Sequence, residues 1–398
     1  MIKKEEISHN FPVVENIIKT RVIFDIKGIL PGPTVLFIGG MHGNEPAGSA
    51  ALYKVGDALK NIVPLKGRVI GINGNLKALR LGKRYLEHDL NRIWLPDNIQ
   101  RLFRGKLQKG EGLELDELIE INEVVEDILK SNKEEIYFID LHTTSAPTVP
   151  FVTMSDSILN RQFCKKFSLP IVLGIEEVLI GPMLGYINDL GYVALAFEAG
   201  QHEDPNSIKH HESFVWLSLA FSGCLDKKQV PNFAEHKELL CKTKDKKPDF
   251  FEVIFRYAIE ADENFIMQPG FANFQPVSKN QIMATTNHGK IVTDKKAYVF
   301  MPLYQKQGAD GFFLIKKISD FWLNFSRRLR KYRFDHLLVL LPGVKRSKLN
   351  YYSLIVNTRV AGLLTDEIFH LLGYRKKIYK SNVTIYTKRD FKSRRKVF

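Results

Sequence analysis

The chain has 398 residues and a formal charge of +14, with 44% hydrophobic and 26% charged residues. This length suggests about two to three domains, and the composition is that of a soluble globular protein. No apolar run approaches the length needed to cross a bilayer, and residues 1–6 lack the apolar core of a secretory signal. Three cysteines without a Cys-x-x-Cys pair do not make a disulfide framework. We therefore expect a cytoplasmic protein with no membrane partner.

The positive charge is concentrated in two basic runs, residues 237–247 and 388–396. Such a charge attracts an acidic partner or confers solubility. Because no recognisable nucleic-acid-binding module accompanies these runs, we interpret them as a solvated linker and tail and expect no nucleic-acid partner.

The first motif occupies residues 39–48, directly after the apolar run 34–38. This pattern predicts a buried strand, a glycine-rich turn and a helix that begins near Pro46. His42 and Glu45 then lie at the carboxyl end of a strand, where open α/β sheets usually bind ligands. An imidazole and a carboxylate are ligands that zinc accepts. The alternative is a turn whose polar side chains cap the following helix.

Further along the chain, residues 47–53 predict a helix and residues 67–75 a strand that ends in a polar turn. This alternation favours an α/β sheet. Residues 84–94 are rich in groups that bind anions, because guanidinium groups offer paired donors to a carboxylate. In the alternative reading, Arg84 and Arg92 pair with Glu87 and Asp89 on the surface.

Two more strand ends carry polar side chains, in residues 136–144 and 192–201. If the first of these strands lies beside strand 34–38, His142 reaches the same ion as His42 and Glu45, and Asp140 can orient an imidazole. Glu198 ends an apolar strand, where a carboxylate is costly without a partner or a task. Near a zinc-bound water it can take a proton and return it to a leaving nitrogen. The alternatives are an ordinary loop histidine and a solvent-facing carboxylate.

Together these motifs resemble the succinylglutamate desuccinylase and aspartoacylase family, which belongs among the zinc carboxypeptidase-like hydrolases. The resemblance covers about residues 30–225 and rests on four segments in the same order: 42–45, 84–92, 140–144 and 198–201. It implies a mixed α/β sheet flanked by helices, followed by a C-terminal β-rich second domain, with one Zn2+ per chain.

By position, the resemblance implies a role for each of seven residues. The zinc ligands are His42, Glu45 and His142, and Glu198 is the general acid/base. Arg84 polarises the scissile carbonyl, and Asn91 and Arg92 hold a substrate carboxylate. The expected reaction is hydrolysis of the amide bond of a small N-acyl amino acid or related acidic molecule.

The segment ahead of Glu198, residues 181–191, contains no arginine. A contact from this segment to a second substrate carboxylate is therefore not expected, and neither activity named by the family is assigned. His202 follows in an acidic stretch. The alternatives for it are a contact with the substrate and a surface role, and we expect the surface role.

We divide the chain into a zinc-hydrolase catalytic domain (1–235), a charged linker (236–247), a β-rich domain (248–318) and an α/β C-terminal extension of unknown role (319–398). Short strands are predicted at 250–257, 290–292 and 296–301. Residues 302–308 form an inter-strand turn or a loop at the active-site mouth. In the extension, residues 321–325 look helical, and residues 336–341 and 383–386 look like strands.

Three functions stay open at this point. The first is a zinc amidohydrolase. The second is a metallocarboxypeptidase that trims peptides, which requires an open groove. The third is a non-catalytic zinc- or ligand-binding protein, which retention of the ligands together with Glu198 disfavours. The acyl group, the amino acid released and any homo-oligomer are not determined by the sequence.

Overall fold

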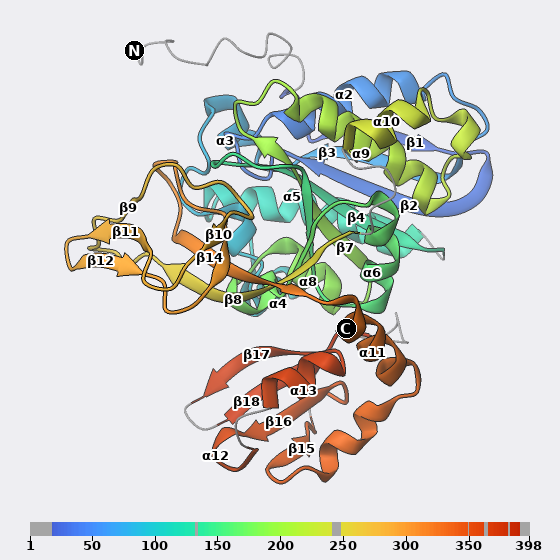
Figure 1. Ribbon diagram of the computed structural model, residues 1–398. Helices are drawn as coiled ribbons and strands as arrows, with labels where there is room; N and C mark the ends of the chain where they lie inside the picture. The colour runs from blue at the N-terminus through green and yellow to red at the C-terminus, as the bar shows by residue number, and fades with distance from the viewer. Residues whose placement is uncertain are drawn as a thin grey trace.

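The computed structural model describes residues 18–131, 134–240, 248–348, 350–361, 365–380 and 383–390. Most of its strands belong to one mixed sheet, flanked by helices (Figure 1). These strands are β1 (Val22–Lys27), β2 (Leu30–Gly39), β3 (Lys66–Asn73), β4 (Ile136–Thr144), β5 (Phe151–Met154), β6 (Ile171–Leu173), β7 (Val193–Gln201), β8 (Phe250–Ala258), β10 (Pro276–Val277), β13 (Ala297–Phe300) and β14 (Asp310–Ile318). Within the described residues their order is β1-β3-β2-β4-β7-β5-β6-β8-β14-β13-β10. The sheet and its helices confirm the predicted fold class.

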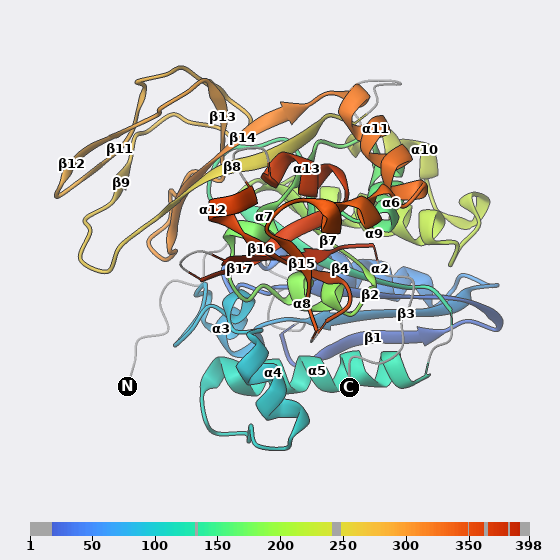
Figure 2. The ribbon, with the colours of Figure 1, turned by 90° about the horizontal axis from the view of Figure 1, so that it is seen from below.

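Helices cover both faces of the sheet, and each face has its own apolar core. One layer contains α2 (Ala47–Leu59), α6 (Ile158–Cys164), α9 (Ser207–Ser222) and α10 (Phe233–Leu240). The other contains α4 (Pro96–Phe103), α5 (Leu113–Ser131) and α8 (Met183–Asp189), with α4 and α5 below the strands in Figure 2. Shorter elements are α3 (Leu76–Leu81), α7 (Ile175–Val178), η1 (Leu90–Arg92), η2 (Lys165–Phe167) and η3 (Lys227–Gln229). Across the described ranges, no helix combines the length and the apolar character needed to cross a bilayer.

The strands β2, β4 and β7 run parallel at the centre of the sheet. Strand β4, all but the last residue of β7, and β2 from Thr34 onward are buried. This is why these stretches read as continuous apolar runs and not as alternating patterns. Their register places Gly39 beside Leu141 and His142 beside Glu198. The predicted strand ends therefore meet at one edge of the sheet, and α2 begins at Ala47, directly after Pro46.

The β-rich region continues this sheet. Strand β8 pairs in parallel with β6, and β14, β13 and β10 follow in turn. The predicted strands at 250–257, 290–292 and 296–301 are confirmed as β8, β12 (Gly289–Val292) and β13. Strand β12 belongs to a small sheet that projects to the left in Figure 1. This sheet also contains β9 (Ile266–Met267) and β11 (Ile282–Thr286). The boundary between catalytic and β-rich domains stays a prediction, but hydrogen bonding crosses it.

The extension forms a separate antiparallel sheet that lies below the main body in Figure 1. Its elements are α11 (Asp320–Lys331), η4 (Phe334–Leu340), β15 (Val344–Arg346), β16 (Ser353–Asn357), α12 (Thr358–Ala361), α13 (Thr365–Leu371), β17 (Tyr374–Lys380) and β18 (Val383–Lys388). The helix at 321–325 and the strand at 383–386 are confirmed. The strand predicted at 336–341 is wrong, because this segment is mostly the 3₁₀-helix η4, which buries Asp335 and Leu338 at a three-residue spacing.

The two basic runs lie only partly within the described residues. Residues 237–240 end α10, and residues 241–247 lie outside the described ranges. In the second run, Lys388 ends β18 and its Nζ pairs with Asp335 Oδ2 at 2.6 Å. Residues 391–396 lie outside the described ranges. The predicted linker and tail therefore stay predictions.

A buried ionic cluster fastens the extension to the catalytic sheet. Asp156, just after β5, is fully buried and receives Arg330 Nη2 at 2.7 Å and Arg375 Nη2 at 2.9 Å. Arg161 pairs with the same carboxylate. Burial opposes ionisation of Asp156, but the three arginines hold its pKa well below the usual range. Arg375 also reaches Glu177 at 2.8 Å, so the extension holds α7 as well as β5.

Candidate metal centre and active site

The turn after β2 has a shape that its glycines permit. Gly40 has a φ of +66°, a value that glycine adopts without a steric penalty. A Cβ on Gly43 would lie 2.2 Å from the backbone carbon of Ala78, so no larger residue fits there. The Gly43 amide donates to Arg84 O at 3.1 Å. This turn therefore presents His42 and Glu45 and also holds the segment that carries Arg84.

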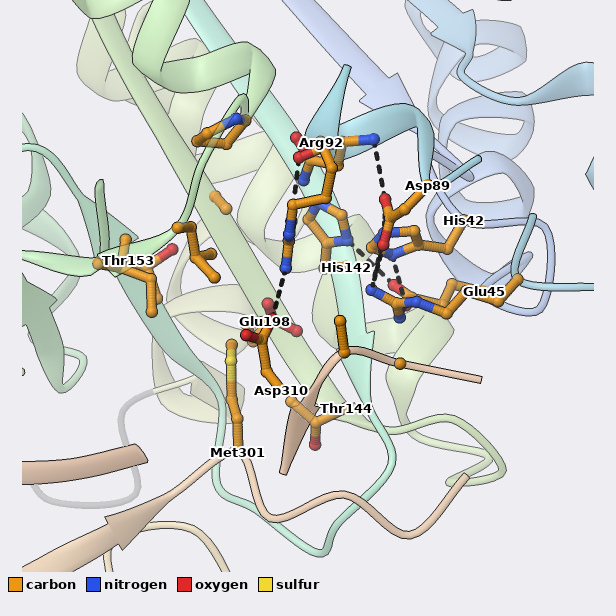
Figure 3. A pocket seen from close by; sticks show the side chains of 18 of the residues that line it. His42, Glu45, Asp89, Arg92, His142, Thr144, Thr153, Glu198, Met301 and Asp310 are labelled. Carbon is orange, nitrogen blue, oxygen red and sulfur yellow. Dashed lines mark hydrogen bonds and ion pairs between the residues drawn. The ribbon is translucent and has the colours of Figure 1, made fainter. Parts of the chain in front are cut away.

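His42, Glu45 and His142 converge as predicted, each of them buried. Their potential ligand atoms all lie within 4.8 Å of one another, and the side chains point toward a common centre in Figure 3. Nδ1 of His42 lies 2.9 Å from Glu45 Oε1, and Nδ1 of His142 lies 3.0 Å from Glu45 Oε2. Burial disfavours the charge on Glu45, but the two imidazoles hold its pKa well below the usual range.

Each histidine has a carboxylate behind it. Nε2 of His142 lies 2.8 Å from Asp140 Oδ2, as predicted from the alternation along β4. Nε2 of His42 lies 3.1 Å from Asp89 Oδ1, a contact that the sequence analysis missed. This leaves Nδ1 of both rings directed at Glu45. Carboxylates in this position fix ring orientation in metal sites and make the imidazole a better ligand, so the donor set fits zinc.

Glu198 lies on β7 directly beside His142 on β4, about 5 Å away across the sheet. It lines the same cavity, and its Oε2 has no hydrogen-bond partner among the described residues. Burial raises the pKa of Glu198 to about 8. This strand end therefore holds a buried carboxyl group that can exchange a proton near neutral pH.

Arg84 reaches the candidate metal ligands from the loop after α3. Its Nη1 lies 3.5 Å from Glu45 Oε1, and its Nη2 donates to Asp89 Oδ2 at 3.0 Å. The pairing of Arg84 with Asp89, an alternative drawn from the sequence, is thus present. It is buried inside the cavity and not on the surface.

Asn91 and Arg92 both line the cavity, but each already has protein partners. Asn91 Oδ1 accepts the Met183 amide at 3.0 Å and so fixes the start of α8. Arg92 Nη2 pairs with Asp310 Oδ2 at 3.0 Å, drawn as a dashed line in Figure 3. Oδ1 of Asp310 accepts a hydrogen bond from Arg256 Nε at 2.6 Å. A substrate carboxylate at Arg92 must therefore compete with Asp310, a residue outside the motifs that point to the site.

The connection between β13 and β14 forms part of the cavity wall. Gln305 Oε1 accepts from Asn44 Nδ2 at 2.9 Å and lies 3.1 Å from His202 Nε2. The predicted segment 302–308 is thus both an inter-strand connection and a wall of the site. His202 also lies 2.7 Å from Thr143 Oγ1 and lines the cavity. The surface role predicted for His202 is wrong, because the loop from a distant part of the chain covers it.

The cavity that contains these groups measures about 390 Å³. Apolar side chains line the part formed by α7, α8 and the segment after β13, among them Ile175, Leu179, Leu184, Met301 and Leu303. Leu184 lies within the segment 181–191 that lacks arginine, so α8 contributes apolar surface here. A cavity of this size and composition suits a small molecule.

Residues 31–213 match the family described as succinylglutamate desuccinylase/aspartoacylase catalytic domain. A probable aspartoacylase of Nostoc sp. is 27% identical over 157 residues, 39% of this chain and 44% of that protein. A succinylglutamate desuccinylase of Pseudomonas fluorescens is 33% identical over 114 residues, 28% of this chain and 31% of that protein. The chain thus matches less than half the length of these relatives.

A solved structure extends the similarity of fold. The crystal structure of a succinylglutamate desuccinylase/aspartoacylase from Rhodobacter sphaeroides superposes with a TM-score of 0.55 at 17% identity, covering 75% of this chain and 88% of that one. At this identity the likeness concerns the fold alone. Residues 31–213, which carry the converging histidines and glutamates, match the succinylglutamate desuccinylase/aspartoacylase catalytic domain.

Proposed function

We propose that this protein is a zinc-dependent hydrolase that cleaves the amide bond of a small N-acyl amino acid or a related acidic molecule. The observation that carries the proposal is the convergence of His42, Glu45 and His142 beside Glu198, inside one cavity. The family match of residues 31–213 supports the same reaction class.

A zinc ion held by His42, Glu45 and His142 would supply Lewis acidity and lower the pKa of a water at its open position toward about 7. Glu198 takes a proton from the attacking water and delivers it to the leaving nitrogen. Arg84 places its guanidinium where negative charge develops on the carbonyl oxygen. Arg92, with Asn91 beside it, orients the substrate through a carboxylate, in competition with Asp310.

The covered cavity favours a small substrate over a peptide. Gln305 of the segment 302–308 contacts Asn44, the neighbour of Glu45 in the chain, and His202. A carboxypeptidase needs room for an extended chain next to the scissile bond, which this wall restricts. We therefore place peptide trimming second.

The test is a panel of N-acyl amino acids and short peptides, assayed for released amine by the purified, zinc-loaded chain. We expect about one zinc per chain by elemental analysis and hydrolysis of at least one N-acyl amino acid. Absence of bound zinc with all three ligands intact would remove the metal assignment. Cleavage of peptides in preference to every N-acyl amino acid would move the function to a carboxypeptidase.

A further inference from the structure

An exposed aromatic face lies on α11, far from the cavity in sequence and absent from the family match. Phe321 is 67% exposed, Trp322 52% and Tyr332, just after the helix, 69%. Phe325 completes the face, and its ring contacts those of Phe321 and Trp322, with centroids 6.0 Å apart in each case. A soluble chain rarely leaves so many large apolar side chains together in water, and a patch of this kind marks an interaction surface.

The opposite side of α11 is fixed to the protein. Leu323 packs into the main core, Ser326 Oγ donates to Leu371 O at 2.7 Å, and Arg330 reaches the buried Asp156. Because a helix advances about 100° per residue, positions 321, 325 and 332 lie within about 40° of one another and point away from these anchors. The aromatic face is therefore held in place with its rings directed outward.

The adjoining 3₁₀-helix also exposes apolar side chains. In η4 and just after it, Leu337 is 55% exposed, Leu340 76% and Leu341 39%. The buried positions Asp335 and Leu338 hold this segment against the extension. Aromatic and aliphatic side chains are thus exposed along one continuous stretch, residues 321–341.

Four basic side chains accompany this stretch: Arg327, Arg328, Lys331 and Arg333, all exposed. Among the residues that the structure describes, no acidic side chain pairs with any of these four. On the helix, Arg327, Arg328 and Lys331 occupy the sector beside the aromatic face, and Arg333 follows at its end. We call these four residues the basic flank.

We propose that the aromatic face and the basic flank of residues 321–341 bind an anionic lipid surface, with α11 lying in the plane of the membrane interface. Interfacial helices combine a face rich in aromatic and aliphatic residues with Lys and Arg that reach anionic headgroups. The sequence-based expectation of no membrane partner rests only on the absence of an apolar run long enough to span a bilayer. Lying on the surface requires no such run.

Charge separates this partner from the other candidates. A second copy docked face to face would bring two basic flanks together, and like charges oppose such a symmetric contact. The phosphates of a nucleic acid would pair with the basic flank, but a nucleic acid has no apolar interior in which Leu337 and Leu340 could be buried. An anionic lipid surface complements both features at once.

The tryptophans provide a direct readout. Of the three in the chain, Trp94 is 3% exposed and Trp216 5%, whereas Trp322 is 52% exposed. Insertion of the aromatic face into the lipid interface therefore shifts the emission of Trp322 to shorter wavelength. The experiment mixes the full chain with vesicles of phosphatidylcholine alone or with an equal part of phosphatidylglycerol, and measures emission together with co-sedimentation.

We expect binding and a blue shift with the anionic vesicles, loss of both at high salt, and neither with phosphatidylcholine alone. Trp322→Phe keeps co-sedimentation and loses the shift. The double variant Phe321→Ser/Trp322→Ser and the double variant Arg328→Glu/Lys331→Glu each lower the partition coefficient about tenfold or more.

Matched controls carry the same changes at exposed sites elsewhere. Lys279→Glu/Lys290→Glu alters the net charge equally on the β-rich region, and Ile29→Ser/Val292→Ser removes exposed apolar side chains. Both leave partitioning within about twofold of the parent, and thermal unfolding confirms that every variant is folded.

Three results would overturn the proposal. One is the absence of binding to anionic vesicles at low salt. Another is equal loss of binding in the control variants. The third is a shift of Trp322 emission without vesicles, either on self-association or on addition of an RNA oligomer, which would assign the surface to a second copy or to nucleic acid.

Discussion

Nε2 of His142 lies 2.8 Å from Oδ2 of Asp140, two residues earlier on the same strand, while Nδ1 of the same ring lies 3.0 Å from Glu45 Oε2. The imidazole of His142 is therefore held between two carboxylates, that of Asp140 behind it and that of Glu45 on the side of the candidate metal site. Asp140 and His142 both belong to β4, which is buried along its whole length. Neither of these two side chains can therefore move without disturbing the central sheet.

This relationship predicts the effect of Asp140→Asn on metal affinity. Loss of the carboxylate behind an imidazole ligand weakens metal binding, and we expect zinc affinity to fall about 10- to 100-fold. Competition with a chromophoric chelator measures it. Asp294→Asn, at a carboxylate with 74% exposure, is the control. Unchanged affinity in Asp140→Asn would mean that Asp140 does not support the ligand.

Glu198→Gln tests the acid/base role. The amide keeps the size of the side chain but cannot accept a proton, so we expect unchanged zinc content and a fall in kcat of about 100-fold or more. Elemental analysis and release of amine measure the two quantities. Glu203→Gln, an exposed neighbour on the following turn, should behave as the parent. Parental turnover in Glu198→Gln would require another base.

Substitutions at Arg92 and Asp310 test the proposed contact between Arg92 and a carboxylate of the substrate. Removing a charged hydrogen bond costs about 1.5–3 kcal/mol, so Arg92→Ala should raise KM for an anionic substrate by about 10- to 100-fold. Asp310→Asn removes the competing carboxylate, and we expect KM for the same substrate to fall. Steady-state kinetics measures both. An unchanged KM in Arg92→Ala would exclude the contact.

Asp156 predicts a pH-dependent contribution to stability. Its pKa in the folded protein lies well below the ordinary value of 3.8, so its stabilising effect is complete above about pH 4 and is lost as the pH falls through the lower, folded value. Asp156→Asn leaves three buried arginines without their carboxylate, which should cost about 3–5 kcal/mol near pH 7.

Urea unfolding of the parent and of Asp156→Asn measures this contribution between pH 7 and pH 3. The difference in unfolding free energy should stay constant down to about pH 4 and shrink below it. A difference that grows toward low pH would contradict the sign of the shift.

The amino-acid sequence was enough to predict which residues meet at the candidate site. Apolar runs with a defined end identify buried parallel strands. Burying a polar residue just after such an end costs free energy unless the residue has a partner or a function. That is why His42, Glu45, His142 and Glu198 were predicted, together with the support of Asp140, which follows from the two-residue period of a strand.

The tertiary structure decided what covers these groups and what competes with them. Asp89 contacts His42 from a loop. Gln305 contacts His202 although the two are 103 residues apart in the chain. Asp310 pairs with the guanidinium of Arg92 over a separation of 218 residues. Such contacts have no local period, because loops from distant segments are brought together by the packing of the sheet and leave no pattern in the residues near either partner.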